Sequence, residues 1–212
     1  MEPKTCLMLG DSIVWYDGHE TLSGPKAIQR GYPAYLREMG FDRVDNAGIS
    51  GACWADRAEP EREAVPLTAR RYDFSLYDAV IVAAGINDFH RASPLGRLTD
   101  EGFDLATVGG ALSAVCVKAR RQRPRGGLLL LTPRWCADGD TKNAANLQLD
   151  DYAALIEAAG RRFGVPTLNL TRLEGYRLDT MTLDGLHPNN AGYAFVCRHA
   201  RWQAAVQKLL NS

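Results

Sequence analysis

The sequence predicts an α/β protein, a single three-layer α/β/α domain over residues 1–212 built on a five-stranded parallel sheet. Short apolar runs alternate along the chain with helix-length amphipathic segments, which is the order that a parallel sheet with crossover helices requires. A length of 212 residues suits one well-packed domain. No repeat, low-complexity tract or linker divides the chain. These observations together predict one continuous sheet rather than two smaller units.

The expected strands are short apolar runs bounded by residues that break regular structure: residues 5–9, a weaker run around Val44, and residues 79–84, 128–131 and 165–170. The first stops at Gly10, and the third, Ala-Val-Ile-Val-Ala-Ala, stops at Gly85. The run around Val44 leads into Asn-Ala-Gly, and the fourth run stops at Thr132 and Pro133. Short continuous runs of this kind are typical of strands that are buried on both faces.

The amphipathic segments between these runs predict the helices: residues 33–39, 105–121 and 147–163, and a last helix from just after Pro188 to about residue 210. Gly40 closes the first helix, as glycine does at many helix C-termini. Gly109 and Gly110 weaken the start of the second, because glycine is a poor helix former. The third has its apolar residues on one face, and Pro188 suits a first helical turn.

Residues 89–104 form a connection that is long for a compact domain. The segment contains Pro94, Gly96 and Gly102 and has no clear periodicity. Long ordered connections often serve as lids or binding loops. We therefore expect this segment to cover the functional site and to help select the substrate.

Composition and charge exclude several classes of function. Lys plus Arg and Asp plus Glu both total 25, so the formal net charge is zero and nothing indicates a nucleic-acid partner. No apolar run is long enough to insert across a membrane, and no amphipathic membrane-binding segment is evident. The five cysteines are scattered without a CxxC pair, which indicates neither a zinc ribbon nor a disulfide framework. With no secretory signal in view, we expect a cytoplasmic protein with reduced thiols.

Polar residues and glycines follow the predicted strands at the points where they end. Gly-Asp-Ser at 10–12 follows the first strand, Asn-Ala-Gly at 46–48 the second, and Gly-Ile-Asn-Asp at 85–88 the third. Asp-Gly-Leu-His at 184–187 lies just before the last helix. Ligands of open α/β sheets bind outside the carboxyl ends of the strands. We therefore expect these four segments to lie together.

The residue types in these segments suit acyl transfer by a serine. The hydroxyl of Ser12 would become a good nucleophile if the imidazole of His187 took its proton. Asp184, three residues earlier, could hold that imidazole in the correct tautomer. The oxyanion needs preorganised donors, which the backbone N–H groups of Ser12 and Gly48 and the side-chain amide of Asn87 could supply. Glycine at position 48 would allow the backbone to approach the substrate without a Cβ atom.

The four segments resemble the four sequence blocks of the SGNH/GDSL hydrolase family, in the family's order and at its usual separations. They span residues 10–187, nearly the whole chain. The resemblance implies a flavodoxin-like SGNH-hydrolase fold and a serine esterase with Ser12 as nucleophile, His187 as general acid/base and Asp184 as its orienter. It also implies an oxyanion hole formed by Ser12, Gly48 and Asn87.

The substrate pocket is not carried over by the resemblance, because Val-Trp-Tyr at 14–16 stands where many relatives have a small polar residue and glycine. Two interpretations of the aromatic residues near the predicted rim are open: they pack the rim, or some of them form an acyl- or sugar-binding wall. The candidate substrate-binding residues are Trp15, Tyr16, Trp54, His90 and Trp135. Arg91 and Arg134 also follow strand ends and are candidates for contact with a polar substrate.

Three further titratable residues receive supporting or structural interpretations. Asp11 and Asp88 flank the nucleophile block and the Asn87 block. Short carboxylates beside tight turns usually accept hydrogen bonds from nearby backbone N–H groups, so we interpret both as supports rather than reactants. His199 falls inside the predicted last helix and is expected to be structural or exposed.

The predicted function is hydrolysis of a carboxylic ester through an acyl-enzyme, with no metal and no organic cofactor. We expect a small-molecule ester as substrate, in particular an acetyl ester of a carbohydrate. An acyltransferase remains an alternative, because transfer and hydrolysis share every step up to the acceptor. A lysophospholipase and a thioesterase remain alternatives as well, because lipid and thioester substrates stay open. A binding module without turnover is less favoured, because all three triad residue types are present. An ordinary α/β-hydrolase is excluded, because its G-x-S-x-G elbow requires a glycine at position 14. The oligomeric state stays open.

Overall fold

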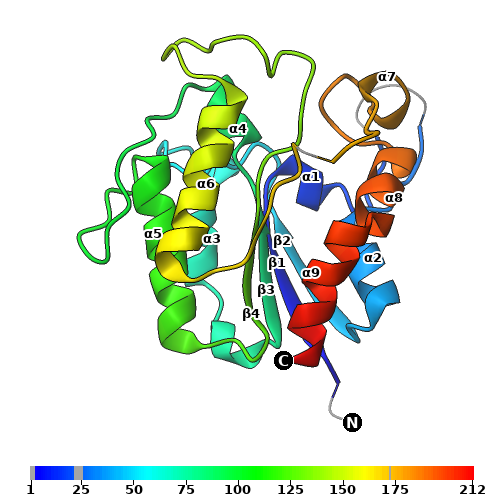
Figure 1. The fold of residues 1–212 in the computed structure, drawn as a ribbon, viewed down its shortest axis with the longest axis horizontal. Helices are drawn as coiled ribbons and strands as arrows, with labels where there is room; N and C mark the ends of the chain where they lie inside the picture. The colour runs from blue at the N-terminus through cyan, green and yellow to red at the C-terminus, as the bar shows by residue number, and fades with distance from the viewer. Residues whose placement is uncertain (1–2, 22–25, 172) are drawn as a thin grey trace.

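Five parallel strands form one sheet in the order β2-β1-β3-β4-β5 in the computed structural model, which describes residues 3–21, 26–171 and 173–212 (Figure 1). The strands are β1 Thr5–Gly10, β2 Arg43–Gly48, β3 Ala79–Ala83, β4 Gly127–Leu131 and β5 Thr167–Leu168. The predicted fold class and all five predicted strands are confirmed. The fifth strand is shorter than predicted, because only two of its residues pair with β4.

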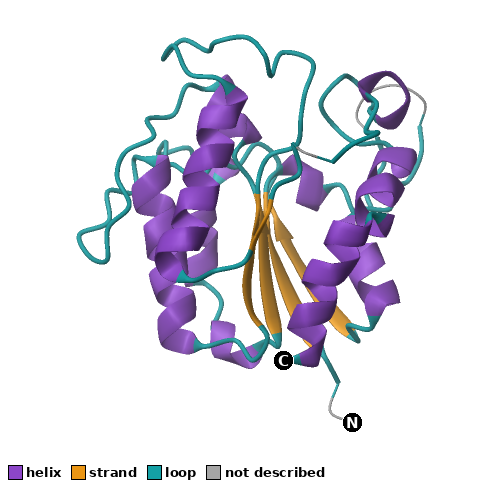
Figure 2. Ribbon diagram, viewed as in Figure 1, coloured by secondary structure: helices purple, strands orange, loops and turns teal. Residues whose placement is uncertain are grey.

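Helices cover both faces of this sheet (Figure 2). They are α1 Ser12–Trp15, α2 Tyr32–Met39, α3 Val65–Arg70, α4 Ile86–His90, α5 Val108–Gln122, α6 Leu149–Phe163, α7 Leu178–Met181, α8 Asn190–Arg198 and α9 Ala200–Asn211, with 3₁₀ turns at Pro60–Arg62 and Phe74–Leu76. Helices α3, α5 and α6 lie on one face, and α2, α8 and α9 lie on the other. Every residue of β3 is buried, which explains why the central strands are continuously apolar.

The carboxyl ends of the strands meet at one edge of the molecule, together with α1, α4 and α7 (Figure 1). The start of β1 and the C-terminus lie toward the opposite edge. The register of the three neighbouring strands aligns Gly10 of β1 with Gly48 of β2 and with Ala83 of β3. The segments that follow these residues therefore start side by side.

The predicted last helix is wrong in two respects: it is divided in two at His199, and Pro188 precedes the helix cap instead of lying in the first turn. The backbone of His199 has ψ 138°, which no helical residue adopts, and its Nδ1 accepts the N–H of Arg201 at 3.2 Å. His199 thus caps α9 instead of lying inside a continuous helix. Helix α8 begins at Asn190 after an Asn189 cap, and Pro188 pairs with Thr182 in an isolated bridge.

The expectation that residues 89–104 cover the functional site is also wrong. After α4 ends at His90, this segment packs along α5: Thr99 N–H donates to Ser113 Oγ at 3.0 Å, and Asp100 pairs with Arg162 at the far end of α6. Gly110 permits this packing, because a Cβ there would lie 2.0 Å from the carbonyl oxygen of Asp104. The two glycines that weakened the helix prediction therefore serve close packing, and α5 starts at Val108, three residues later than predicted.

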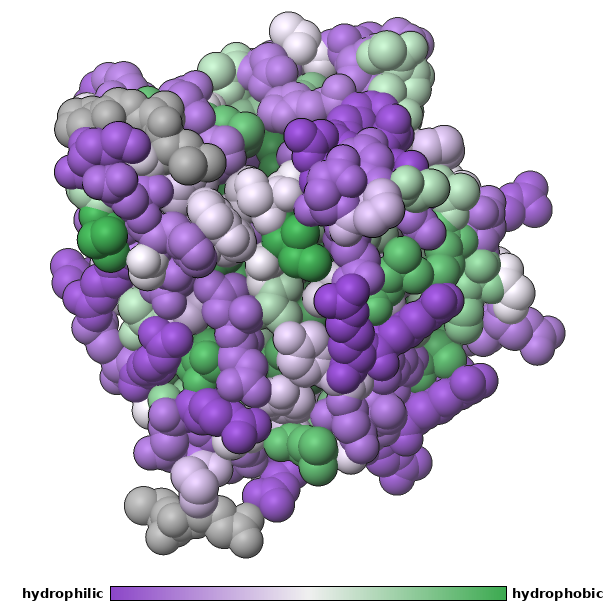
Figure 3. Space-filling model, turned by 180° about the vertical axis from the view of Figure 1, so that it is seen from behind, coloured by the Kyte–Doolittle hydropathy of each residue, from purple (hydrophilic) through white to green (hydrophobic). Residues whose placement is uncertain are grey.

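The face seen in Figure 3 carries no extended apolar surface: apolar side chains lie in groups between polar ones. Among the described residues, the large hydrophobic side chains that are exposed are Ile28 and Leu76. No helix in the described parts of the chain combines the length and apolar character that crossing a membrane requires. All five cysteines are buried and free, in agreement with the sequence analysis.

Candidate active site

The turn from β1 into α1 presents Ser12 at the edge of the sheet. Gly10 makes the turn possible, because a Cβ at this position would lie 2.2 Å from the carbonyl oxygen of Ala83 in β3. Asp11 caps α1, its Oδ1 accepting the N–H of Ile13 at 2.9 Å. Ser12 is the first residue of the helix and its side chain is almost buried.

Ser12, His187 and Asp184 form one hydrogen-bonded line. Ser12 Oγ lies 3.0 Å from His187 Nε2, across 175 positions of sequence. His187 Nδ1 lies 2.8 Å from Asp184 Oδ2. Asp184 Oδ1 accepts the backbone N–H groups of His187 at 2.8 Å and of Leu186 at 3.1 Å, so one carboxylate holds both the ring and the loop.

Asp184 is held in its ionised form by these bonds. Partial burial acts to raise its pKa, but the hydrogen bonds from the ring and backbone of His187 outweigh burial and lower the pKa below its ordinary value. An ionised carboxylate at Nδ1 requires the proton of a neutral imidazole to lie on that nitrogen. The lone pair of Nε2 then faces Ser12, as proton transfer from the hydroxyl requires.

The three candidate oxyanion donors differ in whether they already donate a hydrogen bond within the protein. The Ser12 N–H belongs to the first turn of α1, where amides have no acceptor within the helix. Asn87 Nδ2 donates to the carbonyl of Ala52 at 2.9 Å, which uses one of its two hydrogens. The Gly48 N–H donates to Asn46 Oδ1 at 3.0 Å, so an oxyanion would compete with that side chain for it.

Position 48 needs a glycine because the chain packs against α1 there. The sequence-based reason, close approach of the backbone to the substrate, is wrong. A Cβ on Gly48 would lie 2.5 Å from the backbone nitrogen of Trp15 and 2.9 Å from Val14, so its space is taken by α1 and not by substrate. Asn46, to which the sequence analysis assigned no role, strengthens the same contact by donating from Nδ2 to the carbonyl of Val14 at 3.0 Å. The end of β2 is thereby tied to the nucleophile helix.

Asp11 and Asp88 are buried carboxylates that accept backbone hydrogen bonds, in agreement with the supporting role expected for them. Asp88 accepts the N–H groups of Trp54 at 2.8 Å and Ala55 at 3.0 Å, which are distant in sequence and not neighbours. Burial raises the pKa of Asp11 to about 7 and that of Asp88 to about 6, although the backbone bonds oppose the shift. The charge of Asp88 also acts to raise the pKa of Asp11, after burial.

Two of the predicted substrate-binding aromatics are buried. Trp54 is 0% exposed and donates from Nε1 to the carbonyl of Ala84 at 3.2 Å, so its assignment to a substrate-binding wall is wrong. The ring can fill the core because its one polar group is satisfied there. Tyr16 is also buried, and its ring packs edge-on against the imidazole of His187 at a centroid distance of 5.3 Å. It supports the imidazole from the side.

Three candidates keep part of their surface accessible. Trp15 is stacked on His19 with ring centroids 3.9 Å apart, and Trp135 lines an open cavity of about 370 Å³ with Arg134, Leu170, Thr171, Leu173, Tyr176 and Leu178. His90, at the end of α4, lies 3.2 Å from Asp138 through Nε2.

One cluster in the described part of the chain offers three ligand atoms of the kind that metals bind. The side chains of His90, Cys136 and Asp138 have ligand atoms within 4.8 Å of one another. This nitrogen, sulfur and oxygen set is of the type that Zn²⁺ accepts. The Cys136 thiol and the His90 ring already contact the same Asp138 oxygen, at 3.1 and 3.2 Å, so the cluster is satisfied by its own hydrogen bonds.

The two arginines predicted near the rim do not present free guanidinium groups. Arg91 pairs with Glu59 at 2.6 Å. Arg134 is only 3% exposed and donates from Nη2 to the carbonyl of Leu186 at 2.7 Å, so this part of its guanidinium is committed to the protein although the residue also lines the cavity beside Trp135. One sequence signal could have indicated that Arg134 is buried: it comes directly after Pro133, at the end of a buried strand.

Known proteins resemble this chain in sequence and in fold. The sequence model of the GDSL-like Lipase/Acylhydrolase family matches residues 8–195. No curated protein matches the sequence. A solved structure from Lactobacillus plantarum superimposes with a TM-score of 0.76 at 27% identity, covering 100% of this chain and 98% of the other.

Two other solved structures share the fold. A possible lipase from Chitinophaga pinensis has a TM-score of 0.76 and 21% identity, covering 98% of this chain and 99% of the other. A mutant of an acetyl-xylooligosaccharide esterase from Geobacillus Stearmophilus has a TM-score of 0.60 and 20% identity, covering 96% of this chain and 94% of the other.

Proposed function

This chain belongs to the GDSL-like Lipase/Acylhydrolase family and is a hydrolase that acts on esters, and we propose that it does so as a serine esterase with Ser12 as nucleophile. The observation that supports this mechanism best is the continuous line from Ser12 Oγ to His187 Nε2 and from His187 Nδ1 to Asp184 Oδ2, at 3.0 and 2.8 Å. A hydroxyl, an imidazole and a carboxylate in this order are the parts that activated serine chemistry needs.

In the first half-reaction, Ser12 Oγ attacks the carbonyl carbon of the ester while its proton passes to His187 Nε2. The new O–C bond forms as the carbonyl π electrons move to oxygen, giving a tetrahedral oxyanion. When that intermediate collapses, the bond to the alcohol oxygen breaks, and the alcohol leaves with the proton from His187. Asp184 stabilises the imidazolium that exists between the two transfers.

In the second half-reaction, water takes the place of the alcohol. His187 removes a proton from water as its oxygen attacks the acyl carbon, and it returns that proton to Ser12 Oγ when the acyl-enzyme bond breaks. The oxyanion of each tetrahedral intermediate would accept the Ser12 N–H and the second amide hydrogen of Asn87. The Gly48 N–H would join them by leaving or sharing Asn46 Oδ1.

For the substrate, we propose a small acyl ester, with acetylated carbohydrate as the first candidate. The acetyl-xylooligosaccharide esterase with this fold supports the carbohydrate class. The partly exposed rings of Trp15 and Trp135 support it as well, because aromatic faces suit the apolar faces of sugars. The cavity beside Trp135 has room for a small molecule.

The test is a panel of p-nitrophenyl esters of increasing chain length, with acetylated xylo-oligosaccharides alongside. The wild-type chain should release p-nitrophenol fastest from the shortest esters. Ser12→Ala should remove turnover and leave thermal unfolding unchanged, whereas Ser75→Ala, a matched change at an exposed turn, should leave both unchanged. Adding an alcohol or sugar acceptor and analysing the products separates hydrolysis from transfer. Near-normal turnover by Ser12→Ala would refute the proposed mechanism.

A further inference from the structure

Arg134 carries a buried guanidinium whose hydrogen bonds are only partly satisfied. Nη2 donates to the carbonyl of Leu186, but Nε and Nη1 have no hydrogen-bond partner among the described residues. The guanidinium carbon lies 4.4 Å from the centre of the Tyr176 ring, which packs against its face. A charge buried in this way needs a counter-charge and acceptors close by.

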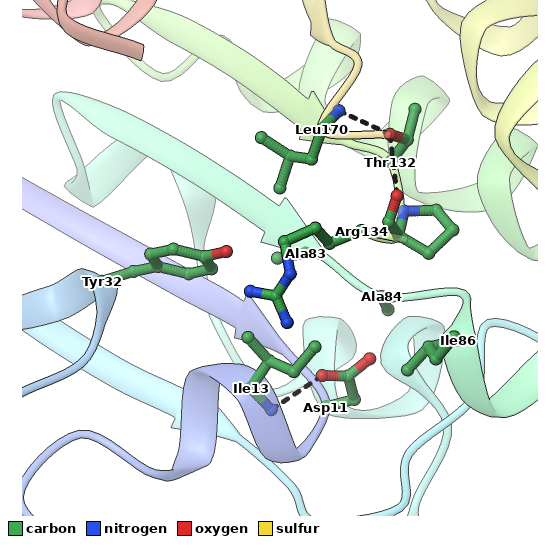
Figure 4. Close-up of a pocket in the computed structure, with 10 residues that line it drawn as sticks. Asp11, Ile13, Tyr32, Ala83, Ala84, Ile86, Thr132, Arg134 and Leu170 are labelled. Atoms are coloured by element: carbon green, nitrogen blue, oxygen red, sulfur yellow. Dashed lines mark hydrogen bonds between the residues drawn. The ribbon is translucent and has the colours of Figure 1, made fainter. Parts of the chain in front are cut away.

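A cavity of about 10 Å³ lies beside Arg134. Its lining includes Arg134, Asp11, Ile13 and Tyr32, and Figure 4 shows the guanidinium between the Tyr32 ring and the Asp11 carboxylate. The Tyr32 hydroxyl has no partner among the described residues either. Most of the lining is apolar, but a cavity of this size has room for about one water molecule, which the Arg134 guanidinium, the Tyr32 hydroxyl and the Asp11 carboxylate could bind together.

The hydrogen bond from Arg134 to Leu186 acts on the peptide that precedes His187. The carbonyl of this peptide, on Leu186, accepts from Arg134 at 2.7 Å, and its N–H, on His187, donates to Asp184 at 2.8 Å. The peptide plane is therefore held from both sides. Because this plane sets where the His187 side chain starts, its two bonds control the distance between the imidazole and Ser12.

The other side of Arg134 faces the turn that carries the nucleophile. Asp11 precedes Ser12 and caps its helix, and the charge of Arg134 opposes the rise in the pKa of Asp11 that burial causes. The guanidinium thus lies between the two halves of the site: it is hydrogen-bonded to the Leu186 carbonyl of one, and it shares a small cavity with Asp11 of the other.

We propose that Arg134 is a positioning residue, which ties the loop of Asp184 and His187 to the turn of Ser12 through the Leu186 carbonyl on one side and the Asp11 cavity on the other. This inference rests on the proposed function. Arg134 takes no part in proton transfer. Its role is to keep His187 Nε2 within hydrogen-bond distance of Ser12 Oγ, at 3.0 Å.

The test measures how fast Ser12 is phosphonylated by a p-nitrophenyl phosphonate, which reports the reactivity of the nucleophile without turnover. It also measures kcat and KM for p-nitrophenyl acetate. Arg134→Met keeps an unbranched apolar stem and removes the charge and the N–H groups. In this variant the phosphonylation rate and kcat should fall on the order of 10²-fold with little change in KM, since a misplacement of about 1 Å has an effect of this size. Arg134→Lys keeps the charge and should recover part of the rate.

Matched variants separate positioning from general destabilisation. Arg162→Met makes the same chemical change at the exposed end of α6, and Val206→Ala removes a buried side chain of α9; both should react at the wild-type rate below their unfolding temperatures. If Arg134→Met does not fold, Tyr176→Leu, which removes the ring against the guanidinium, should show a smaller loss in the same direction.

A crystal structure of a folded Arg134 variant gives a second readout. The 186–187 peptide should be rotated and Nε2 displaced from Ser12 Oγ. A wild-type phosphonylation rate, or an unchanged distance between these two atoms, would overturn the inference. Failure of the proposed function is a different result, because the wild-type chain itself would then show no turnover that depends on Ser12.

Discussion

Replacing Asp184 by Asn tests the hydrogen-bonded line more sharply than removing any whole side chain. In the wild-type chain, Oδ1 accepts two backbone N–H groups and Oδ2 accepts the N–H of His187 Nδ1. An asparagine has only one acceptor oxygen. If that oxygen stays with the two backbone groups, its NH₂ group points at Nδ1 and forces the imidazole to carry its proton on Nε2.

The imidazole would then donate to Ser12 Oγ and could no longer accept its proton. The opposite orientation of the amide would place its NH₂ group against two backbone N–H groups, each of which would lose its acceptor at a cost of about 1–3 kcal/mol. The first orientation is therefore preferred. A change of tautomer with the geometry retained lowers kcat by about 10⁴-fold, which corresponds to about 5.4 kcal/mol of transition-state stabilisation.

The assay compares kcat for p-nitrophenyl acetate in the wild-type chain, Asp184→Asn and Asp179→Asn, with thermal unfolding of all three. Asp179 lies in α7 on the surface and pairs with Arg177, so its variant makes the same chemical change away from the line. It should keep wild-type activity. The reasoning would be refuted if Asp184→Asn folded normally and stayed within about tenfold of the wild-type kcat.

Three further predictions concern the surroundings of the site. Burial raises the pKa of Asp11 from 3.8 to about 7, so between these values this side chain holds a proton in the folded chain that it releases in the unfolded chain, and its contribution to stability falls as pH rises. Asp11→Asn removes this contribution and should change the slope of Tm against pH between about pH 5 and pH 7 accordingly; slopes identical to the wild type would contradict the assignment. Gly48→Ala places a Cβ 2.5 Å from the backbone of α1 and should lower both Tm and kcat, the latter on the order of 10²-fold, whereas Gly139→Ala, whose Cβ meets its nearest neighbour at 3.2 Å, should be tolerated. Trp54→Ala should destabilise the fold by about 3–5 kcal/mol in denaturant unfolding, as loss of a buried aromatic does, while Trp135→Ala should change KM and leave stability nearly unchanged; the reverse pattern would return Trp54 to the substrate pocket.

The sequence predicted the strands better than the connections between them. The first, third and fourth strands are recognised from a local property, a short apolar run that ends next to a glycine or proline, and no distant residue is needed to see it. The same holds for the four segments at the strand ends, because a parallel sheet brings such ends to one edge whatever the loops do. Ser12 and His187 could therefore be expected to meet although most of the chain lies between them.

The predictions for the connections were wrong where two weak local signals compete. Residues 89–104 lack periodicity, and this property is shared by lids and by segments that pack on a helix. Only the contact of this segment with α5 decides between them, and the glycines at 109 and 110 that permit the contact looked like flaws in a helix. At His199 helix α8 ends without glycine or proline, and an imidazole nitrogen there caps the start of α9.

By itself, the sequence determined the α/β/α class, the order of the strands along the chain, and the serine, histidine and aspartate that the candidate site would use, because apolar runs and motif spacing are properties of neighbouring residues. The tertiary structure alone decided that Trp54 belongs to the core, that packing against α1 demands Gly48, and that Arg134 turns inward to the Leu186 carbonyl. Each of these depends on which surfaces meet after the chain has folded. A local pattern carries no record of those partners, since the same side chain can be satisfied by water at a rim or by a carbonyl in a core.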